Sequence, residues 1–188
     1  MRIVVLGDSL SAGFGLAAPD ALPAKLERAL KAKGIAVAVE NAGVSGDTAS
    51  GGLGRLDWSV GEGVDAVIVE LGANDALRGL DPKVTRAALE NIIRRLKERR
   101  IAVLLAGMLA PRNYGADYVK AFDPIYPELA AAHDLILYPF ILEGVAGIPA
   151  LNQGDGMHPT AAGVDVMVKG LLPKVEELVA RVRAAKGG

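Results

Sequence analysis

The chain of 188 residues contains no cysteine, and only two of its residues are histidine. The absence of cysteine excludes thiol catalysis, disulfide bonds and cysteine-based metal sites, and it is compatible with any cellular compartment. Two imidazoles are also few for a catalytic zinc site, which usually takes three protein ligands. The sequence therefore argues against a metal-dependent hydrolase that would use Asp155 and His158 as ligands, and we expect no resident metal.

An excess of charge of one sign is lacking as well. The 21 basic and 22 acidic residues give a formal net charge of -1, and no basic patch stands out along the chain, so nucleic acid is not an expected partner. No apolar stretch approaches the roughly 20 residues of a membrane span, so no stable membrane insertion is expected. Hydrophobic residues make up 51% of the chain, which predicts one globular domain over residues 1–188.

The start of the chain leaves no room for a visible signal peptide, because Met1 lies two residues before the first apolar run. If the chain is complete as written, we expect a cytoplasmic protein. If a leader has been trimmed and replaced by Met1, we expect a periplasmic or secreted one. Localisation stays open between these two.

Apolar runs of strand length alternate with amphipathic helical segments along the whole chain. The runs at 3–6, 35–39, 64–71, 101–106 and 135–138 are predicted strands, and the glycine-rich segment 41–54 is predicted to be mostly loop. Strands that alternate with helices predict a parallel sheet with right-handed crossovers and helices on both faces. We expect a three-layer α/β sandwich with strand order 2-1-3-4-5, because that order places the first strand's loop beside the third's.

Polar residues directly follow the first strand, which ends at Gly7, Asp8 and Ser9. Open α/β sheets bind their ligands at the carboxyl edge of the strands, so Ser9 is a candidate nucleophile. The alternative is a β-turn in which Asp8 and Ser9 only bond backbone amides. Ser11 is a weaker candidate, because it lies two residues further from the end of the strand.

A serine nucleophile needs a base, and the two histidines differ in their surroundings. His133 follows an alanine-rich helical segment, where a cation near the helix C-terminus is the ordinary role. His158 lies in a tight polar loop, three residues after Asp155. A carboxylate at that spacing can hold one ring nitrogen and leave the other free as a base. The alternative is that Asp155 caps the following helix and His158 is a surface residue.

Attack on an acyl carbonyl also needs hydrogen-bond donors for the oxyanion that forms. The backbone N–H groups of Ser9 and Gly46 and the side-chain amide of Asn74 are the candidates, because each follows a predicted strand. Turn geometry is the alternative role for Gly46, and an Asx turn or a helix cap is the alternative for Asn74. A parallel sheet brings all these loops to one edge, so they can share one cleft.

Four short blocks of the sequence together resemble a known family. They are Gly7-Asp8-Ser9-Leu10, Ser45-Gly46-Asp47-Thr48, Gly72-Ala73-Asn74-Asp75 and Asp155-Gly156-Met157-His158-Pro159. Their order and spread over nearly the whole chain resemble the SGNH hydrolases, also called the GDSL esterase/lipase family. The segments 69–72, 77–79, 111–115 and 125–127 are similar to the bacterial branch of multifunctional thioesterase I, arylesterase and lysophospholipase L1.

The resemblance implies a flavodoxin-like fold, a catalytic triad of Ser9, His158 and Asp155, and an oxyanion hole formed by Ser9, Gly46 and Asn74. It also implies that the enzyme needs neither a metal nor an organic cofactor. The expected activity is hydrolysis of small-molecule carboxylic esters and thioesters, such as short to medium acyl or aryl esters, acyl-CoA or lysophospholipid. A carbohydrate O-deacetylase of the same family is the alternative.

The acyl group is expected to contact a mobile loop after the third strand and apolar residues of later loops. The resemblance places the loop, with Asp75 and Leu77, and Leu109 beside the acyl group. Leu142 and Ile148 are chosen because they are apolar and lie in loops. The expected substrate contacts are Asp75, Leu77, Leu109, Leu142 and Ile148.

Two other functions fit single features of the sequence. The segment 13–18 matches the dinucleotide-binding pattern G-x-G-x-x-A, but residues 7–12 separate it from the strand that it should follow, and Pro19 comes before the next helix. A non-enzymatic scaffold that binds a partner is the second. Trp58 could stack on a sugar and support the deacetylase alternative, although packing is its more ordinary role.

Overall fold

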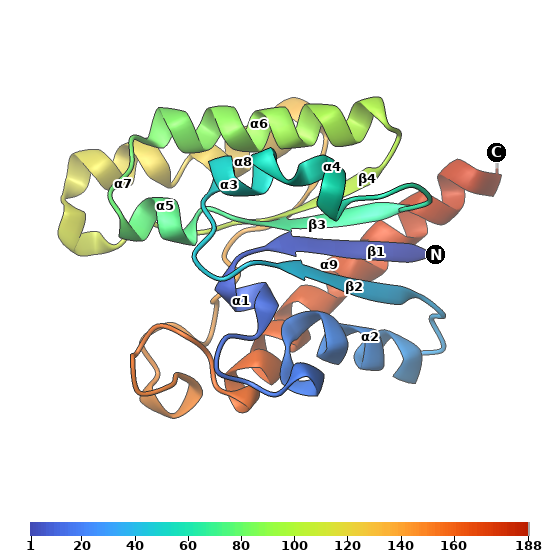
Figure 1. Ribbon diagram of the computed structural model, residues 1–188, viewed down its shortest axis with the longest axis horizontal. Helices are drawn as coiled ribbons and strands as arrows, with labels where there is room; N and C mark the ends of the chain where they lie inside the picture. The colour runs from blue at the N-terminus through green and yellow to red at the C-terminus, as the bar shows by residue number, and fades with distance from the viewer. Residues whose placement is uncertain (188) are drawn as a thin grey trace.

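The computed structural model describes residues 1–187, which form a five-stranded sheet between two layers of helices (Figure 1). All neighbouring strands pair in parallel, in the order β2-β1-β3-β4-β5. The strands are β1 (Arg2–Gly7), β2 (Ala38–Gly43), β3 (Ala66–Glu70), β4 (Ala102–Ala106) and β5 (Ile136–Tyr138). The α/β class and the strand order predicted from the sequence are confirmed.

The central strands are apolar along their whole length because helices cover both of their faces. In β1 the run from Ile3 to Leu6 is at most 1% exposed, and all five residues of β3 are buried. A strand buried on both faces cannot alternate apolar and polar residues, so it appears in the sequence as a continuous apolar run. The first strand and the third were therefore easy to locate in the sequence.

The second strand was predicted at 35–39, which is wrong: β2 extends from Ala38 to Gly43. It is an edge strand that pairs only with β1, and most of its side chains are not buried. Its backbone pairs Asn41 with Val5 and Gly43 with Gly7, and such a ladder needs no apolar side chains. The sheet therefore continues into the segment predicted as loop, and the chain leaves β2 beside the end of β1.

One helical layer contains α2 (Leu22–Ala32) and α9 (Ala161–Gly187), with the single turn α1 (Ser9–Ala12) at its end (Figure 1). The opposite layer is built around α6 (Pro82–Glu98). Its other members are α3 (Ala49–Gly54), α4 (Leu56–Ser59), α5 (Ala73–Leu77), α7 (Ala116–Phe122) and α8 (Ile125–His133). Short 3₁₀ helices lie at Ala18–Asp20, Arg112–Tyr114 and Pro149–Leu151.

The end of β2 lies against α1 so closely that only glycine fits there. A Cβ atom on Gly43 would lie 2.3 Å from the backbone nitrogen of Ala12 and 2.8 Å from the carbonyl oxygen of Asp8. Both contacts are with backbone atoms, which cannot rotate away as a side chain can. This close approach fixes where the chain after β1 lies relative to the chain after β2.

Within residues 1–187, no helix combines the length and the apolar character that a bilayer crossing requires.

Candidate active site

The turn after β1 presents Ser9 at the carboxyl edge of the sheet. Gly7 ends the strand, and the side chain of Asp8 caps α1 by accepting a hydrogen bond from the backbone N–H of Leu10 at 3.0 Å. Gly13 closes this single turn in the left-handed region, with φ of 81°, and its N–H donates to the carbonyl of Ser9. Capping at both ends holds a helix far too short to be stable alone.

Ser9, His158 and Asp155 form one chain of hydrogen bonds, although Ser9 and His158 are 149 positions apart. The Nε2 atom of His158 lies 3.0 Å from Oγ of Ser9, and its Nδ1 atom lies 2.5 Å from Oδ2 of Asp155. If Nδ1 carries the proton, it donates to the carboxylate, and Nε2 can then accept the proton of the serine hydroxyl.

The carboxyl group of Asp155 is held in its ionised form. The backbone N–H groups of His158 and Met157 donate to Oδ1 at 3.0 and 2.9 Å. The backbone bond from His158, the bond from its ring and the backbone bond from Met157 hold the pKa of Asp155 well below its usual range. The alternative helix-cap role is not observed, because Thr160 Oγ1 accepts from Gly163 N at the start of α9.

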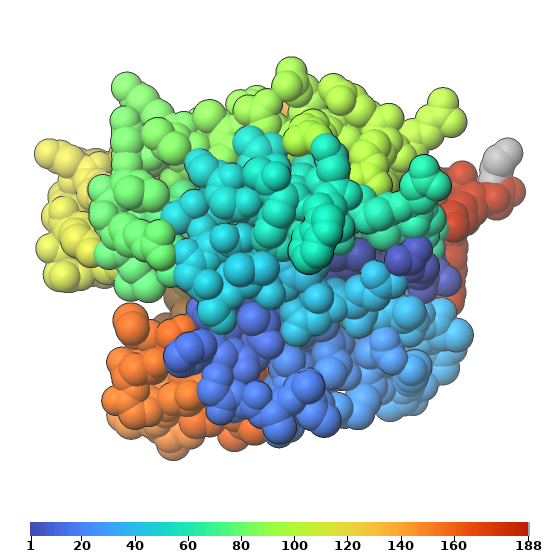
Figure 2. All heavy atoms as spheres, in the orientation of Figure 1, coloured from blue at the N-terminus to red at the C-terminus, as the bar shows by residue number. Residues whose placement is uncertain are grey.

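The loop that carries His158 is fastened to the loop that follows α1. The side-chain amide of Gln153 donates to the carbonyl oxygens of Phe14 and Pro159, at 2.7 and 2.9 Å. The rings of Phe14 and His158 have centroids 4.4 Å apart and are tilted by 35°. In Figure 2 the orange segment before α9 lies directly against the blue N-terminal segment. Sequence reasoning did not find Phe14 or Gln153, because their contacts depend on the folded chain.

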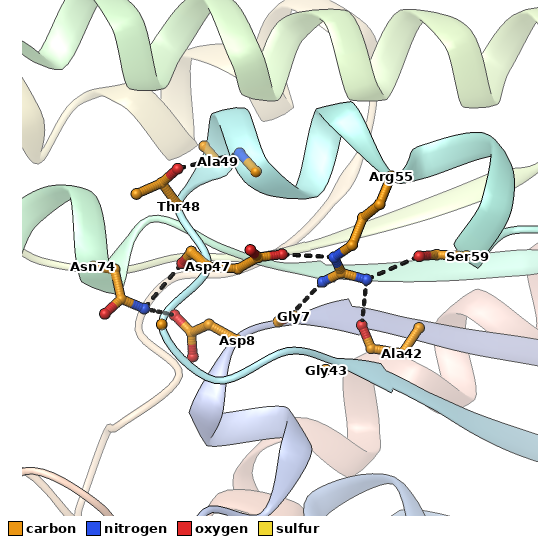
Figure 3. Close-up of polar contacts among 12 residues, drawn as sticks. Gly7, Asp8, Ala42, Gly43, Asp47, Thr48, Ala49, Arg55, Ser59 and Asn74 are labelled. Atoms are coloured by element: carbon orange, nitrogen blue, oxygen red, sulfur yellow. Dashed lines mark hydrogen bonds and ion pairs between the residues drawn. The ribbon is translucent and has the colours of Figure 1, made fainter.

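The three candidate oxyanion donors lie on three different segments. Nδ2 of Asn74 donates to the carbonyl oxygen of Asp47 at 2.9 Å and to Oδ2 of Asp8 at 3.3 Å (Figure 3). Gly46 directly precedes Asp47 and has φ of 86°, a conformation that favours glycine. Among the described residues, neither the N–H of Gly46 nor that of Ser9 has a hydrogen-bond acceptor. These two amides are therefore available to a ligand.

Ser11 is not placed to act as the nucleophile. Its side chain is fully buried, and its hydroxyl donates to Oε2 of Glu70 at 2.6 Å. Burial, and then the nearby charge of Asp8, raise the pKa of Glu70 well above its usual range. Burial also raises the pKa of Asp8, to about 6. This pair of buried carboxyl groups lies beneath the site. The role of Glu70, the last residue of a buried strand, could not be predicted from the sequence.

A cavity of about 550 Å³ opens beside Ser9 and His158, within the size range of small-molecule sites. Its wall is mostly apolar and comes from the loops at the carboxyl edge of the sheet. The lining residues are Ser9, Leu10, Ala73, Asn74, Ala76, Leu77, Met108, Leu109, Ala110, Pro111, Arg112, Phe140, Leu142, Ala146, Gly147, Asn152, Gly156, Met157 and His158.

Of the five expected substrate contacts, the structure places Leu77, Leu109 and Leu142 on this wall and two elsewhere. Asp75 is fully buried: its carboxylate accepts hydrogen bonds from Ala49 N at 2.8 Å and Thr85 Oγ1 at 2.9 Å, so it joins α5 to α3 and α6. Ile148 is half exposed and lies outside the wall, just before a 3₁₀ helix. The structure therefore places neither residue on the wall of the cavity.

Two further residues considered from the sequence lie away from the cavity. His133 is in the last turn of α8, with Nε2 3.6 Å from Glu90. Trp58 is in α4, is 87% exposed and does not line the cavity. Within residues 1–187, no three acidic or imidazole side chains gather closely enough to hold a metal ion.

Comparison with known proteins gives a consistent result. Residues 5–166 match the GDSL-like Lipase/Acylhydrolase family. Esterase TesA of Pseudomonas aeruginosa is 38% identical over 178 residues, which cover 94% of this chain and 89% of that protein. Thioesterase 1/protease 1/lysophospholipase L1 of Escherichia coli K12 is 40% identical over 178 residues, which cover 92% of this chain and 84% of the relative.

A solved structure agrees with these relatives. The crystal structure of AlinE4, described as an SGNH-hydrolase family esterase, is 47% identical, superposes with a TM-score of 0.79, and the match covers 94% of this chain and 95% of that one. The family match spans most of the chain, and His158 and Ser9 line the cavity together. The chain belongs to the GDSL-like lipase/acylhydrolase family.

Proposed function

We propose that the protein is a serine hydrolase that cleaves carboxylic esters and acyl thioesters through an acyl-enzyme on Ser9. The observation that carries this proposal is the hydrogen-bonded chain from Asp155 through His158 to Ser9, which ends at the wall of an apolar cavity. A hydroxyl with a base on one side and an acyl-sized cavity on the other has what nucleophilic acyl transfer needs.

The reaction proceeds in two steps. Oγ of Ser9 attacks the acyl carbonyl while Nε2 of His158 takes its proton, and the imidazolium then protonates the departing alcohol or thiol. Water, deprotonated by the same imidazole, attacks the acyl-enzyme and releases the carboxylic acid and Ser9. Asp155 stays ionised throughout, which keeps the ring oriented and stabilises its positive charge.

The oxyanion accepts hydrogen bonds from the backbone N–H groups of Ser9 and Gly46 and from the side-chain amide of Asn74. That amide keeps its shorter bond to the carbonyl of Asp47, at 2.9 Å. Its second hydrogen turns from Asp8, at 3.3 Å, to the oxyanion. Because the bond to Asp8 is the longer of the two, it is the one that the substrate displaces.

The cavity favours acyl or aryl groups of short to medium length. Leu77, Leu109 and Leu142 contribute apolar surface, and about 550 Å³ accommodates a chain of several carbons. Two relatives are named as an esterase and as a thioesterase with lysophospholipase activity, which supports esters, acyl-CoA and lysophospholipid as substrates. A carbohydrate O-deacetylase is not favoured, because the wall is mostly apolar and Trp58 lies outside it.

Labelling with a fluorophosphonate tests the nucleophile. We expect one covalent adduct, which peptide mapping places on Ser9, and loss of both labelling and ester hydrolysis in Ser9→Ala. The exposed Ser50 on α3 offers a control, and Ser50→Ala should label and turn over like the wild type. Labelling at Ser11, or an active Ser9→Ala variant, would reject the proposal.

A substrate panel tests the specificity. p-Nitrophenyl esters from two to twelve carbons, acyl-CoA thioesters, a lysophospholipid and acetylated sugars are compared by kcat/KM. We expect short to medium acyl esters to be the best substrates and acetylated sugars to be poor ones. A preference for acetylated sugars would instead support the deacetylase.

A further inference from the structure

We propose that Arg55 is a positioning residue for the oxyanion hole, a proposal that rests on the function proposed above. Arg55 lies between α3 and α4, touches no part of the cavity and was not singled out by its sequence context. It holds the segments that carry the three oxyanion donors in a fixed relation to one another. The donors then do not have to be rearranged when the tetrahedral intermediate forms.

The guanidinium of Arg55 makes four hydrogen bonds to four different segments (Figure 3). Nη2 donates to the carbonyl of Gly7 at 2.8 Å, and Nη1 donates to the carbonyl of Ala42 at 2.8 Å. Nε donates to the carboxylate of Asp47 at 2.6 Å, and Nη1 also donates to Oγ of Ser59 at 2.9 Å. The side chain is 16% exposed, so water competes little for these bonds.

Each donor of the oxyanion hole is linked to a group that Arg55 binds, either through one or two residues of the chain or through one hydrogen bond. Gly7 lies two residues before Ser9, and Asp47 directly follows Gly46. The backbone carbonyl of Asp47 accepts the amide of Asn74 at 2.9 Å, so Asp47 is bonded to Arg55 through its side chain and to Asn74 through its backbone. Moving Asp47 would therefore displace Gly46 and release Asn74 together.

The loop from Val44 to Gly46 has little else to hold it. All three of its residues are exposed. Its described hydrogen bonds are three: Val44 N–H to the carbonyl of Gly7 at 3.0 Å, Asp47 N–H to the carbonyl of Val44 at 3.1 Å, and Nη2 of Arg78 to the carbonyl of Gly46 at 2.8 Å. Oxyanion donors act only when they point at the place where negative charge develops. In a mobile loop, the N–H group of Gly46 would not keep that orientation. A planar guanidinium can bond two carbonyls and a carboxylate at once, whereas a lysine ammonium on a flexible stem cannot hold all three in plane.

The test compares Arg55→Lys and Arg55→Ala with the wild type on a p-nitrophenyl ester, with active sites counted by fluorophosphonate titration. We expect kcat per titrated site to fall about 10- to 100-fold and KM to stay within about twofold. The inhibition constant of an alkyl trifluoromethyl ketone, which adds to serine as a tetrahedral oxyanion, should rise by the same factor as kcat falls. A merely structural role would lower the number of titrated sites and leave kcat per site unchanged.

Chemical rescue and a second variant make the outcome decisive. Guanidinium ion at millimolar concentration should restore part of kcat in Arg55→Ala and have no effect on the wild type. If Arg55→Ala does not fold, Asp47→Asn weakens the same bond, and a smaller loss of kcat at unchanged KM is expected. Arg95→Ala is the matched control, because it removes another arginine–aspartate pair, with Asp57, on the surface of α6.

The proposal is overturned if both Arg55 variants have the kcat per site and the ketone inhibition constant of the wild type. Where these variants do not fold, the same result in Asp47→Asn overturns it. An increase in KM alone would overturn it as well. Failure of the proposed function is a separate observation, namely a wild-type protein that the fluorophosphonate does not label at Ser9.

Discussion

At the scale of single residues, the site contains carboxyl groups whose pKa values are shifted in opposite directions. Backbone and side-chain donors lower the pKa of Asp155, so it can stabilise a positively charged imidazole on His158. Burial raises the pKa of Asp8, to about 6, and the pKa of Glu70, so these two carboxyl groups bind a proton more readily than exposed ones. Ser11 is hydrogen-bonded to Glu70, whereas Ser9 faces an imidazole, so the surroundings favour Ser9 as the nucleophile.

Replacing Asn74 tests the oxyanion hole at its side-chain donor. We expect Asn74→Ala to lower kcat by about two orders of magnitude, or roughly 3 kcal/mol of barrier, because one of the donors to the oxyanion is removed. The measurement is ester turnover per site titrated with fluorophosphonate, which also corrects for any protein that unfolds when Asp8 loses its partner. Asn91→Ala, at a half-buried position on α6, should turn over normally. Unchanged turnover in Asn74→Ala would remove Asn74 from the hole.

Replacing Asp155 tests the orientation of the ring. Asp155→Asn is expected to lower kcat by about 10³- to 10⁴-fold, because an amide at this position no longer favours the proton on Nδ1 of His158. Titration with fluorophosphonate should slow in parallel, while circular dichroism stays unchanged. Asp117→Asn, at an exposed position on α7, is the control. A loss of less than tenfold would contradict the proposed role of Asp155.

Sequence reasoning located residues that directly follow strands and missed those defined by long-range contacts. Ser9 and Asn74 could be found because each lies in the first turn of a short helix shortly after a strand, and His158 because it lies in a polar loop three residues after Asp155. Arg55 could not, because its partners at Gly7, Ala42 and Asp47 are backbone or loop groups that only the fold brings near. The burial of Asp75 could not be expected for the same reason, since Ala49 and Thr85, which hold its carboxylate, come near it only in the fold.

At the scale of secondary structure elements, the edge strand β2 decides how closely the loops of the site approach one another. Sequence pattern could not define it, because Glu40 and Asn41 are polar and exposed, and the ladder to β1 uses only backbone atoms. The alternation of strands and helices did predict the sheet, since buried parallel strands are continuous apolar runs. The boundary between β2 and the following loop had to come from the structure.

A pair of glycine substitutions tests the contact between β2 and α1. Gly43→Ala should destabilise the protein by about 1 to 3 kcal/mol, and lower Tm by roughly 3 to 10 °C, because its Cβ would meet the backbone of Ala12 and Asp8. Gly54→Ala, at the last residue of α3, meets nothing within 4 Å and should be neutral or stabilising by up to about 1 kcal/mol. Equal Tm values for the two variants would contradict the close approach.

At the scale of the whole molecule, carboxyl groups with lowered pKa values and carboxyl groups with raised pKa values change stability with pH in opposite directions. Lys186 donates a hydrogen bond to Asp65, and Lys31 donates one to Glu27. These bonds are the largest reason that the pKa of each carboxyl group is lowered. The pKa of Asp155 is lowered as well. Their contribution to stability is present above ordinary carboxyl pKa values and is lost as the pH falls below them. Asp8 and Glu70 act in the opposite sense, because burial raises their pKa.

For Asp8, the folded protein binds the proton more tightly than the unfolded chain, so its contribution is full below about pH 4 and is lost as the pH rises to about 6. Because the pKa of Glu70 is also raised, the contribution of Glu70 to stability is lost as the pH rises further. We therefore expect the free energy of unfolding to be greatest near about pH 4 to 5 and to decline toward neutral pH. Urea unfolding midpoints between pH 3 and 9 measure this profile.

Glutamine has the shape of a protonated glutamate, so Glu70→Gln separates the contribution of this group. The variant should be close to the wild type in stability at pH 5 and more stable than the wild type at pH 9, because it carries no buried proton to lose. Glu62→Gln, at an exposed position, should change stability little and equally at both pH values. A Glu70→Gln variant that is weaker than the wild type at pH 9 and equal to it at pH 5 would mean that Glu70 is ionised in the folded protein.

The contact between Ser9 and His158 also has a consequence for how the protein is made. During translation the hydroxyl leaves the ribosome early, whereas the imidazole is added 149 residues later. Under the proposed mechanism, every unfinished product therefore carries the nucleophile without its proton acceptor. In that mechanism, hydrolysis begins only after His158 has been synthesised and the chain has folded around it.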